Sequence, residues 1–295
     1  MISGTLQILC EGIVIGSVYA LLGLGFVVIY KASGIFNFAI GSVAAFNALL
    51  FWQLTSRFGI PVWIVALLII CISVGLGFLA ERTCLRPLIG QPILAAILMT
   101  LAISIFISSA TTLIWSGSAY QYIPYFGVKP VQLGGIILSP ARIFTFVLAV
   151  IIFGIVGFWL KYSKSSLSIR AVSEDQQAAL SKGINVSNVF GQTWAISWVI
   201  SGIAGVLFGF ITIVSGTLSM MGLKAVPVVL CGGLESIGGA AILGLAIGVL
   251  EAFCAEYLNK IVGGAIEEVF AYIILLVVLM VRPYGLFGWK KIERV

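Results

Sequence analysis

Long apolar runs dominate the chain, and polar residues gather in the short stretches between them. Six of these runs contain no Asp, Glu, Lys or Arg, namely residues 12–30, 32–56, 58–80, 87–128, 143–160 and 183–223. Each is near or above the roughly 20 residues that a helix needs to cross a bilayer. A membrane barrel would instead show short segments of alternating hydrophobicity. The pattern therefore predicts an all-α polytopic membrane protein with about eight or nine transmembrane helices.

Two interruptions of the apolar pattern resemble each other. Ser33-Gly34 separates a first span, at about 11–30, from a second one at about 35–52, which carries Gly41. Ser215-Gly216 follows a span at about 191–214 and precedes Gly222 in a short apolar segment that ends near residue 234. Broken segments at corresponding positions of two halves are typical of transporters with inverted repeats. We therefore expect short or broken helices and a possible inverted repeat within a single transmembrane domain that spans residues 1–295.

The remaining apolar runs predict ordinary spans. These lie at about 61–80, 92–115, 142–160, 240–251 and 266–281, and residues 215–234 count as one broken crossing. Residues 116–140 are expected to form an aromatic loop at the outer interface. The first span lacks the features of a cleavable signal peptide, so we expect it to remain in the protein.

Residues 161–191 form the longest polar stretch. Ser173 followed by Gln176 has the spacing of a capping box, which predicts a short helix over 174–182. Glu174 and Asp175 would then lie in its first turn, where the helix dipole favours negative charge, and Gly183 would follow its end. Such a stretch is either a solvated connector or a docking element for a partner.

Hydroxyl side chains form a stripe on the fourth span. Thr100, Ser104 and Ser108 are four residues apart and therefore share one helix face. They either bond between helices or their own backbone, or line a translocation pathway. Asn37, at the start of the second apolar run, either caps that helix or faces the interior.

Glycines mark the candidate hinges and close helix contacts. They are Gly34, Gly216, Gly222, Gly232, Gly233, Gly238 and Gly239.

Composition excludes several classes of function. The chain of 295 residues is 61% hydrophobic and 9% charged, and it has no histidine. Its five cysteines are scattered without a C-x-x-C pair, so we expect no metal site and no Ser/His/Asp or Cys/His catalytic set. There is no phosphate-binding loop of the G-x-x-x-x-G-K-[ST] type, so any ATP hydrolysis must occur on another subunit.

The net charge of +6 has a topological explanation that makes a nucleic-acid partner unnecessary. Basic residues accumulate in cytoplasmic loops. With residues 161–182 inside, Lys224 stays unplaced and the basic residues outside are Arg57, Lys129, Arg142 and Lys260. This distribution predicts nine crossings, with the N-terminus outside and the C-terminus, with its basic tail at 289–295, in the cytoplasm.

Four segments in order resemble the LivH-type permeases of branched-chain amino acid ABC importers. They are YALLGLGFVVIY with GIFNFAIGS, RAVSEDQQAALSKGIN, GLKAVPVVLCGGLESIGGAAILG, and RPYGLFG. The resemblance covers essentially the whole chain. It implies a bacterial or archaeal inner-membrane subunit that needs no cofactor of its own. Its partners would be a second LivH/LivM-type permease, two ATPases that bind ATP, an external substrate-binding protein and membrane lipid.

The resemblance also assigns roles by position. The stretch Gln177-Ala178-Ala179 followed by Gly183 has the spacing of the loop through which ABC permeases dock their ATPases, with Gln177 where Glu is usual. Arg170, Ala171, Glu174 and Ile184 complete this candidate coupling loop. Asn37, Phe38 and Gly41 match the family's second-segment motif, beside the candidate pathway residues Thr100, Ser104 and Ser108.

Two positions depart from the family pattern. Ile40 stands where His or Gln is common, and Glu235 replaces a glycine. An aliphatic residue at position 40 leaves the cargo open between branched-chain amino acids, other amino acids, amides, urea and organic acids.

A self-sufficient secondary transporter or channel is the alternative. Ion coupling would need an ionisable group within the membrane. Glu251 is the candidate, and we expect it near the outer end of its span, paired with Lys260.

Overall fold

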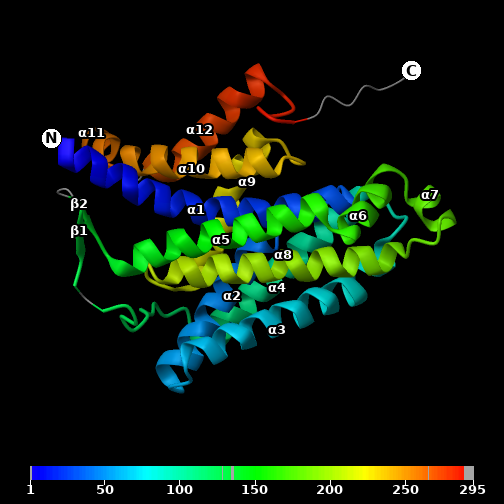
Figure 1. Cartoon of the computed structure of the whole chain (residues 1–295), viewed down its shortest axis with the longest axis horizontal. Coiled ribbons are helices and arrows are strands. Elements are labelled where there is room, and N and C mark those ends of the chain that lie inside the picture. The colour runs from blue at the N-terminus through cyan, green and yellow to red at the C-terminus, as the bar shows by residue number, and fades with distance from the viewer. Residues whose placement is uncertain (1, 128, 134–135, 265, 289–295) are drawn as a thin grey trace.

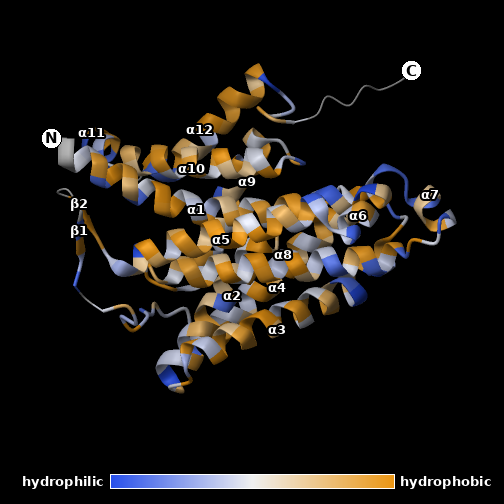
Figure 2. Cartoon of the chain, in the orientation of Figure 1, coloured by the Kyte–Doolittle hydropathy of each residue, from blue (hydrophilic) through white to orange (hydrophobic). Residues whose placement is uncertain are grey.

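The computed structural model describes residues 2–127, 129–133, 136–264 and 266–288. Most of the long helices run along one common direction and pack into a single bundle (Figure 1). Within the described residues, six helices are long and apolar enough to cross a membrane: Gly4–Ser33, Val62–Leu88, Ile93–Trp115, Pro140–Tyr162, Val186–Gly209 and Ile237–Val262. Apolar residues cover the lengths of these helices, and hydrophilic residues gather at their ends (Figure 2). The predicted all-α membrane fold is confirmed.

The first half of the chain contains α1 (Ile2–Ser33), α2 (Ile40–Trp52), α3 (Val62–Ala80), α4 (Ile93–Trp115) and α5 (Pro140–Tyr162), with the turns η1 (Gln53–Arg57), η2 (Glu81–Leu85) and η3 (Arg86–Leu88). The second half contains α6 (Lys164–Glu174), α7 (Gln176–Ser181), α8 (Val186–Gly209), η4 (Gly216–Met220), α9 (Met221–Gly232), α10 (Ile237–Phe253), η5 (Cys254–Leu258), α11 (Asn259–Val262) and α12 (Ile266–Val281). Strands β1 (Val131–Leu133) and β2 (Ile136–Leu138) form an antiparallel hairpin before α5.

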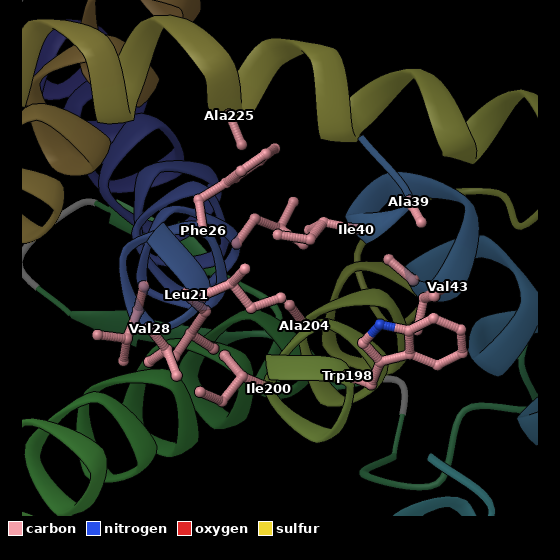
Figure 3. Packing of buried hydrophobic residues seen from close by; sticks show 14 of the residues in the cluster. Leu21, Phe26, Val28, Ala39, Ile40, Val43, Trp198, Ile200, Ala204 and Ala225 are labelled. Carbon is pink, nitrogen blue, oxygen red and sulfur yellow. The ribbon is translucent and has the colours of Figure 1, made fainter. Parts of the chain in front are cut away.

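Helices α1 and α8 form the centre of the bundle. Most of α1 and α8 is buried, whereas α3, α4 and α5 leave most of their surface exposed. Figure 3 shows Leu21 and Phe26 of α1 in one cluster with Ile200 and Ala204 of α8. The exposed side chains of the outer helices are apolar, as in a bundle that lies in lipid.

Small residues allow the central helices to approach each other. A Cβ atom on Gly16 of α1 would lie 2.8 Å from the Cα atom of Leu245 in α10. On the facing helix, Gly244 is equally tight against Ala20. Such contacts place backbone against backbone, which is how membrane helices associate without a hydrophobic driving force between them.

The two halves of the chain are arranged alike. In each half a long central helix, α1 or α8, is followed by a break, a short helix, α2 or α9, and a longer one, α3 or α10. Helix α1 packs against α9 and α10 of the other half, and α8 packs against α2 and α3. The chain direction in α1 is opposite to that in α8 (Figure 1). This arrangement supports the inverted repeat that the sequence suggested.

The chain begins at one end of the bundle, and its last described residues lie at the other. An ion pair between Glu11 and Arg142 joins the starts of α1 and α5. Near the chain's last described residues, the Leu286 backbone N–H donates to the Cys231 carbonyl at 2.7 Å. This is the arrangement that an odd number of crossings produces. The count of nine crossings stays a prediction, and the basic tail at 289–295 lies outside the described residues.

Aromatic side chains close the end of the bundle that holds the N-terminus. The Tyr122 hydroxyl donates to the Ala48 carbonyl at 2.8 Å, and its ring packs on Phe51 and Phe210. Burial raises the pKa of Tyr122, so this phenol stays protonated and continues to donate. The predicted aromatic loop is present, with the hairpin β1–β2 as an addition that its sequence did not indicate.

Several boundaries differ from the prediction, two of them beside the breaks. Helix α2 begins at Ile40 and not near Ile35, because Asn37 Oδ1 accepts the Ala39 backbone N–H at 3.0 Å and holds the preceding residues in a turn. Helix α8 ends at Gly209, about one turn before the predicted position. The break at Ser33-Gly34 is confirmed, since α1 ends at Ser33 and Gly34 has a φ of +68°.

Candidate coupling surface and translocation pathway

The polar stretch between α5 and α8 folds into two helices, α6 and α7, where the sequence predicted one. Glu174 is the last residue of α6, and Asp175 has an extended backbone with a φ of −154°. Asp175 Oδ1 accepts the backbone N–H groups of Gln177 at 2.8 Å and Ala178 at 3.0 Å. The predicted capping box at Ser173 is therefore wrong. Asp175 caps α7, since a short carboxylate reaches these N–H groups directly.

The end of α7 agrees with the prediction. The Ile184 N–H donates to the Ala179 carbonyl at 3.0 Å, and the Gly183 N–H donates to the Leu180 carbonyl at 3.0 Å. This pair of bonds is a Schellman motif, which requires a left-handed residue just past the helix. Gly183 supplies it with a φ of +81°.

Helix α7 projects from the bundle and exposes most of its surface (Figure 1). Gln177, Ala178 and Leu180 are exposed, whereas Ala179 is buried against its own chain. The sequence placed Ala179 in the candidate docking stretch, but its side chain is only 3% exposed. Ala179 lies on the inner face of α7, whereas Gln177, Ala178 and Leu180 form its exposed outer face.

Helix α6 is amphipathic and fixes α7 to the bundle. Ile169 and Val172 point into the core, Ala171 is half-buried, and Arg170 is exposed. The Arg170 guanidinium donates to the Leu160 carbonyl at the end of α5, at 3.4 Å. The charged stretch is thus helical and held against the bundle by α6.

A small cavity of about 80 Å³ lies where α7 meets the bundle. It is lined by Gln176 of α7, Ser33 and Ile35 of the first break, Glu81 and Trp194 among others. Glu81 is buried and accepts two hydrogen bonds from Arg86, from Nε at 3.1 Å and Nη2 at 2.9 Å. The start of α7 therefore shares a cavity with the segment that leads into α2.

The structure brings together two of the sequence-predicted pathway segments. The Thr100 hydroxyl of α4 donates to the Phe36 carbonyl at 3.1 Å and accepts the Phe38 backbone N–H at 3.2 Å. Thr100 thereby satisfies backbone groups of the broken segment before α2. Ser104 and Ser108 lie further along α4 and are half-buried. Their role in a pathway stays a prediction.

Asn37, Ile40 and Gly41 are buried. The Asn37 amide nitrogen has no hydrogen-bond partner in the described part of the chain. Figure 3 shows Ile40 beside Phe26 of α1 and Ala225 of α9, within the apolar core. Gly41 is in contact with Gly222, since a Cβ atom on Gly41 would lie 2.7 Å from the Gly222 Cα atom. The two broken segments therefore meet backbone to backbone, with no space for a side chain.

The other predicted glycines fall into two groups. Gly232 packs on Gly239, and Gly233, with a φ of +91°, packs on Gly288. Gly34, Gly216 and Gly238 have no tight contacts, and of these only Gly34 has a positive φ.

An ion pair between α9 and the apolar helix α10 was missed by sequence reasoning. Lys224 of α9 bonds Glu251 of α10, and Lys260 bonds Glu256 instead. The predicted Glu251–Lys260 pair is therefore wrong. Glu251 lies well inside the apolar span Ile237–Val262 and not near its outer end, because α10 continues through η5 into α11. Partners 27 residues apart leave no local signal in the sequence.

A second missed residue is Asn47, which is fully buried in α2. Its amide nitrogen donates to the Val43 carbonyl at 2.9 Å, and its Oδ1 accepts from Ser73 of α3 at 3.2 Å. Gly202 of α8 faces both side chains. The bond from Ser73 joins α2 and α3 on the surface of α8.

Broken helices at the centre of a polytopic bundle, together with an exposed helical surface at one end, define a membrane transport subunit. The family of branched-chain amino acid transport system permease components matches residues 8–279. The chain belongs to this family.

Individual relatives match almost end to end. The high-affinity branched-chain amino acid transport system permease protein BraD of Pseudomonas aeruginosa is 31% identical, over 98% of this chain and 98% of its own. The high-affinity branched-chain amino acid transport system permease protein LivH of Escherichia coli is 28% identical, over 98% of this chain and 97% of the LivH chain. Among solved structures, PsaBC from Streptococcus pneumoniae in complex with Fab has a TM-score of 0.51 at 14% identity, covering 96% of this chain and 97% of that one, which shows the fold alone.

Proposed function

We propose that this chain is a transmembrane permease subunit of a binding-protein-dependent ABC importer for branched-chain amino acids. The observation that carries the proposal is family membership along nearly the whole chain, with relatives named for this transport. In the proposed complex the chain pairs with a second permease of the same family. Two ATPase subunits bind and hydrolyse ATP, and an external binding protein delivers the cargo.

Helix α7 is the proposed docking element for an ATPase. Its exposed residues Gln177, Ala178 and Leu180 would lie in a groove of the partner, while the buried Ala179 keeps the helix on its own chain. Arg170 and Glu174 would fix the register by charge. Gly183 and Ile184 close the helix and hold it at a defined angle to α8.

The small cavity beneath α7 suggests how a movement reaches the membrane spans. Gln176 shares this cavity with Ser33 and Ile35. The backbones of Phe36 and Phe38, which follow Ile35, bond the Thr100 hydroxyl. A shift of α7 would therefore act on the break between α1 and α2. Because Gly41 of α2 is in direct contact with Gly222, the same shift would reach α9.

The proposed orientation places α6, α7 and the C-terminus in the cytoplasm and the N-terminus outside. It follows from the charge distribution, since Lys31, Arg82, Arg86, Lys161, Lys164, Arg170 and Lys182 then lie on the cytoplasmic side. The aromatic end of the bundle would face the external binding protein.

The alternative of a secondary transporter receives less support. It requires an ionisable group within the membrane whose charge changes during transport. Glu251 is such a group by position, but Lys224 neutralises it. The family comparison favours the importer.

Co-purification from native membranes tests the proposal. The tagged chain is extracted in mild detergent, and its partners are identified by mass spectrometry. We expect two P-loop ATPases and a second permease of the family. A chain that elutes alone, or with itself only, and that transports solute along an ion gradient without ATP would contradict the proposal.

A further inference from the structure

A cavity of about 460 Å³ lies between α1, the segment after α8, η4, α9 and the start of α12. This volume falls within the roughly 300–1,000 Å³ of small-molecule sites. Much of its wall is apolar, formed by Phe208, Ile213, Met220, Met221 and Leu223. Tyr19, near the middle of the apolar span Gly4–Ser33, also lines it, so the cavity reaches deep into the membrane.

Two charged side chains of opposite sign line the same cavity. Lys224 comes from α9 and Glu268 from α12. A lysine ammonium has three N–H donors, and one of these bonds Glu251. Since Glu251 belongs to α10 and is not part of the cavity wall, it holds the ammonium from the side and leaves donors for a ligand.

Glu268 has no hydrogen bond or ion pair with any described residue, and it is exposed. An unmatched carboxylate beside an apolar wall is an acceptor for a ligand cation. Charged side chains within membrane spans are expensive and usually serve function, and Lys224 pairs with Glu251 of such a span. The cavity therefore offers one cation, one anion and an apolar surface.

We propose that this cavity is a binding site, within the permease, for a zwitterionic amino acid with an apolar side chain. Lys224 binds the α-carboxylate, Glu268 binds the α-ammonium, and the apolar wall receives the side chain. The inference rests on the proposed function and deepens it, because it gives the permease its own selectivity in addition to that of the binding protein.

The charge arrangement selects a zwitterion over ligands that carry one charge. A carboxylate alone leaves Glu268 without a partner, and an amine alone leaves Lys224 with Glu251 only. Each loses one charge-assisted hydrogen bond, which is worth at least about tenfold in affinity, or about 1.4 kcal/mol.

Protection of a cysteine in the cavity wall tests the site. Thr217 is exposed in the wall, and none of the five native cysteines lines the cavity. The Thr217→Cys variant is purified with its partner subunits, checked for leucine uptake in proteoliposomes, and labelled with a thiol reagent. We expect L-leucine to protect it at concentrations at least tenfold lower than 4-methylpentanoate or 3-methylbutylamine require.

Variants of the charged groups sharpen the test. In the Thr217→Cys background, Glu268→Gln and the pair Lys224→Gln/Glu251→Gln are expected to raise the leucine concentration for half-protection at least tenfold. Glu256→Gln is the matched control, because Glu256 lies outside the cavity and bonds Lys260.

The outcomes separate the two claims. Absence of protection in an assembled complex that imports leucine would overturn the site and leave the proposed function intact, as would equal protection by the two single-charge compounds. A wild-type complex that fails to assemble or imports no branched-chain amino acid would overturn both.

Discussion

Helices α2 and α9 occupy corresponding places in the two halves of the chain, yet they differ in chemistry. Each follows a long central helix and a break, and they touch each other at Gly41 and Gly222. Helix α2 contains no charge, and its buried Asn47 donates to the Val43 carbonyl and accepts from Ser73. Helix α9 contains Pro227 and Lys224, and Lys224 faces a cavity.

The difference shows that a repeated architecture need not repeat its function. The shared features, a break and a glycine contact, hold the two halves together. The features present in one copy only are the candidates for handling cargo. Substitutions at the Gly41–Gly222 contact should therefore disturb the packing of both halves of the chain. Substitutions at Lys224 should disturb the second half only.

The largest effect is expected at the shared contact. Gly41→Leu forces a side chain into space that the Gly222 backbone occupies, with even the Cβ atom only 2.7 Å from its Cα atom. Overpacking of this kind costs about 1–3 kcal/mol or more, and here backbone must move. We expect no monodisperse protein by size-exclusion chromatography in detergent.

Gly238→Ala is the matched control, because nothing lies within 4 Å of its Cβ position. This glycine was predicted as a hinge, yet the substitution should leave the elution profile and the melting temperature nearly unchanged. Normal folding of Gly41→Leu would show that the two broken segments do not depend on their contact.

The next effect concerns the charge pair of α9. Lys224→Met leaves the buried Glu251 without its cation, which costs about 3–5 kcal/mol when a buried pair is broken. The double variant Lys224→Met/Glu251→Gln removes both charges and should recover most of this loss. Thermal unfolding of the wild type, the two single variants and the double variant measures the coupling. Additive effects would contradict a direct pair.

A smaller effect is expected at the end of α7. Gly183→Val places a β-branched residue at a φ of +81°, which costs about 1–2 kcal/mol. Its Cβ position is open, so the strain acts on the local backbone only. We expect ATP hydrolysis to continue while uptake falls, as measured together in proteoliposomes. Unchanged uptake per ATP would argue against α7 as the coupling element.

The smallest effect distinguishes two caps of α7. Asp175→Ala removes the side chain that accepts two backbone N–H groups, at about 0.5–2 kcal/mol. Ser173→Ala should leave hydrogen exchange at the start of α7 unchanged, because the Ser173 hydroxyl donates to the Arg170 carbonyl within α6. Hydrogen exchange at the start of α7 reports both changes. If exchange became faster in Ser173→Ala but not in Asp175→Ala, the result would contradict capping by Asp175 and support the capping box that the sequence predicted.

Local signals explain what the sequence predicted correctly. The predicted spans at 61–80 and 92–115 agree with α3 and α4 to within a residue or two, since lipid requires uninterrupted apolar helices. The break after Ser33 and the role of Gly183 were also readable, because a left-handed glycine depends on its immediate neighbours.

Other features depend on contacts between distant residues. Helix α6 was not predicted because most of its residues are polar. Its inner face, with Ile169 and Val172, is buried only through contact with the bundle. Lys224 was left unplaced because its partner stands on another helix. The pairing of Gly41 with Gly222 was suggested by their similar surroundings, but their contact needed the fold.

Binding-protein-dependent uptake by the reconstituted complex tests the central claim most directly. The chain, its second permease and both ATPases are placed in proteoliposomes with the external binding protein and labelled L-leucine. The account predicts uptake that requires ATP and the binding protein and that falls when α7 is altered by Gly183→Val. Uptake by the chain alone, driven by an ion gradient and indifferent to ATP, would contradict it.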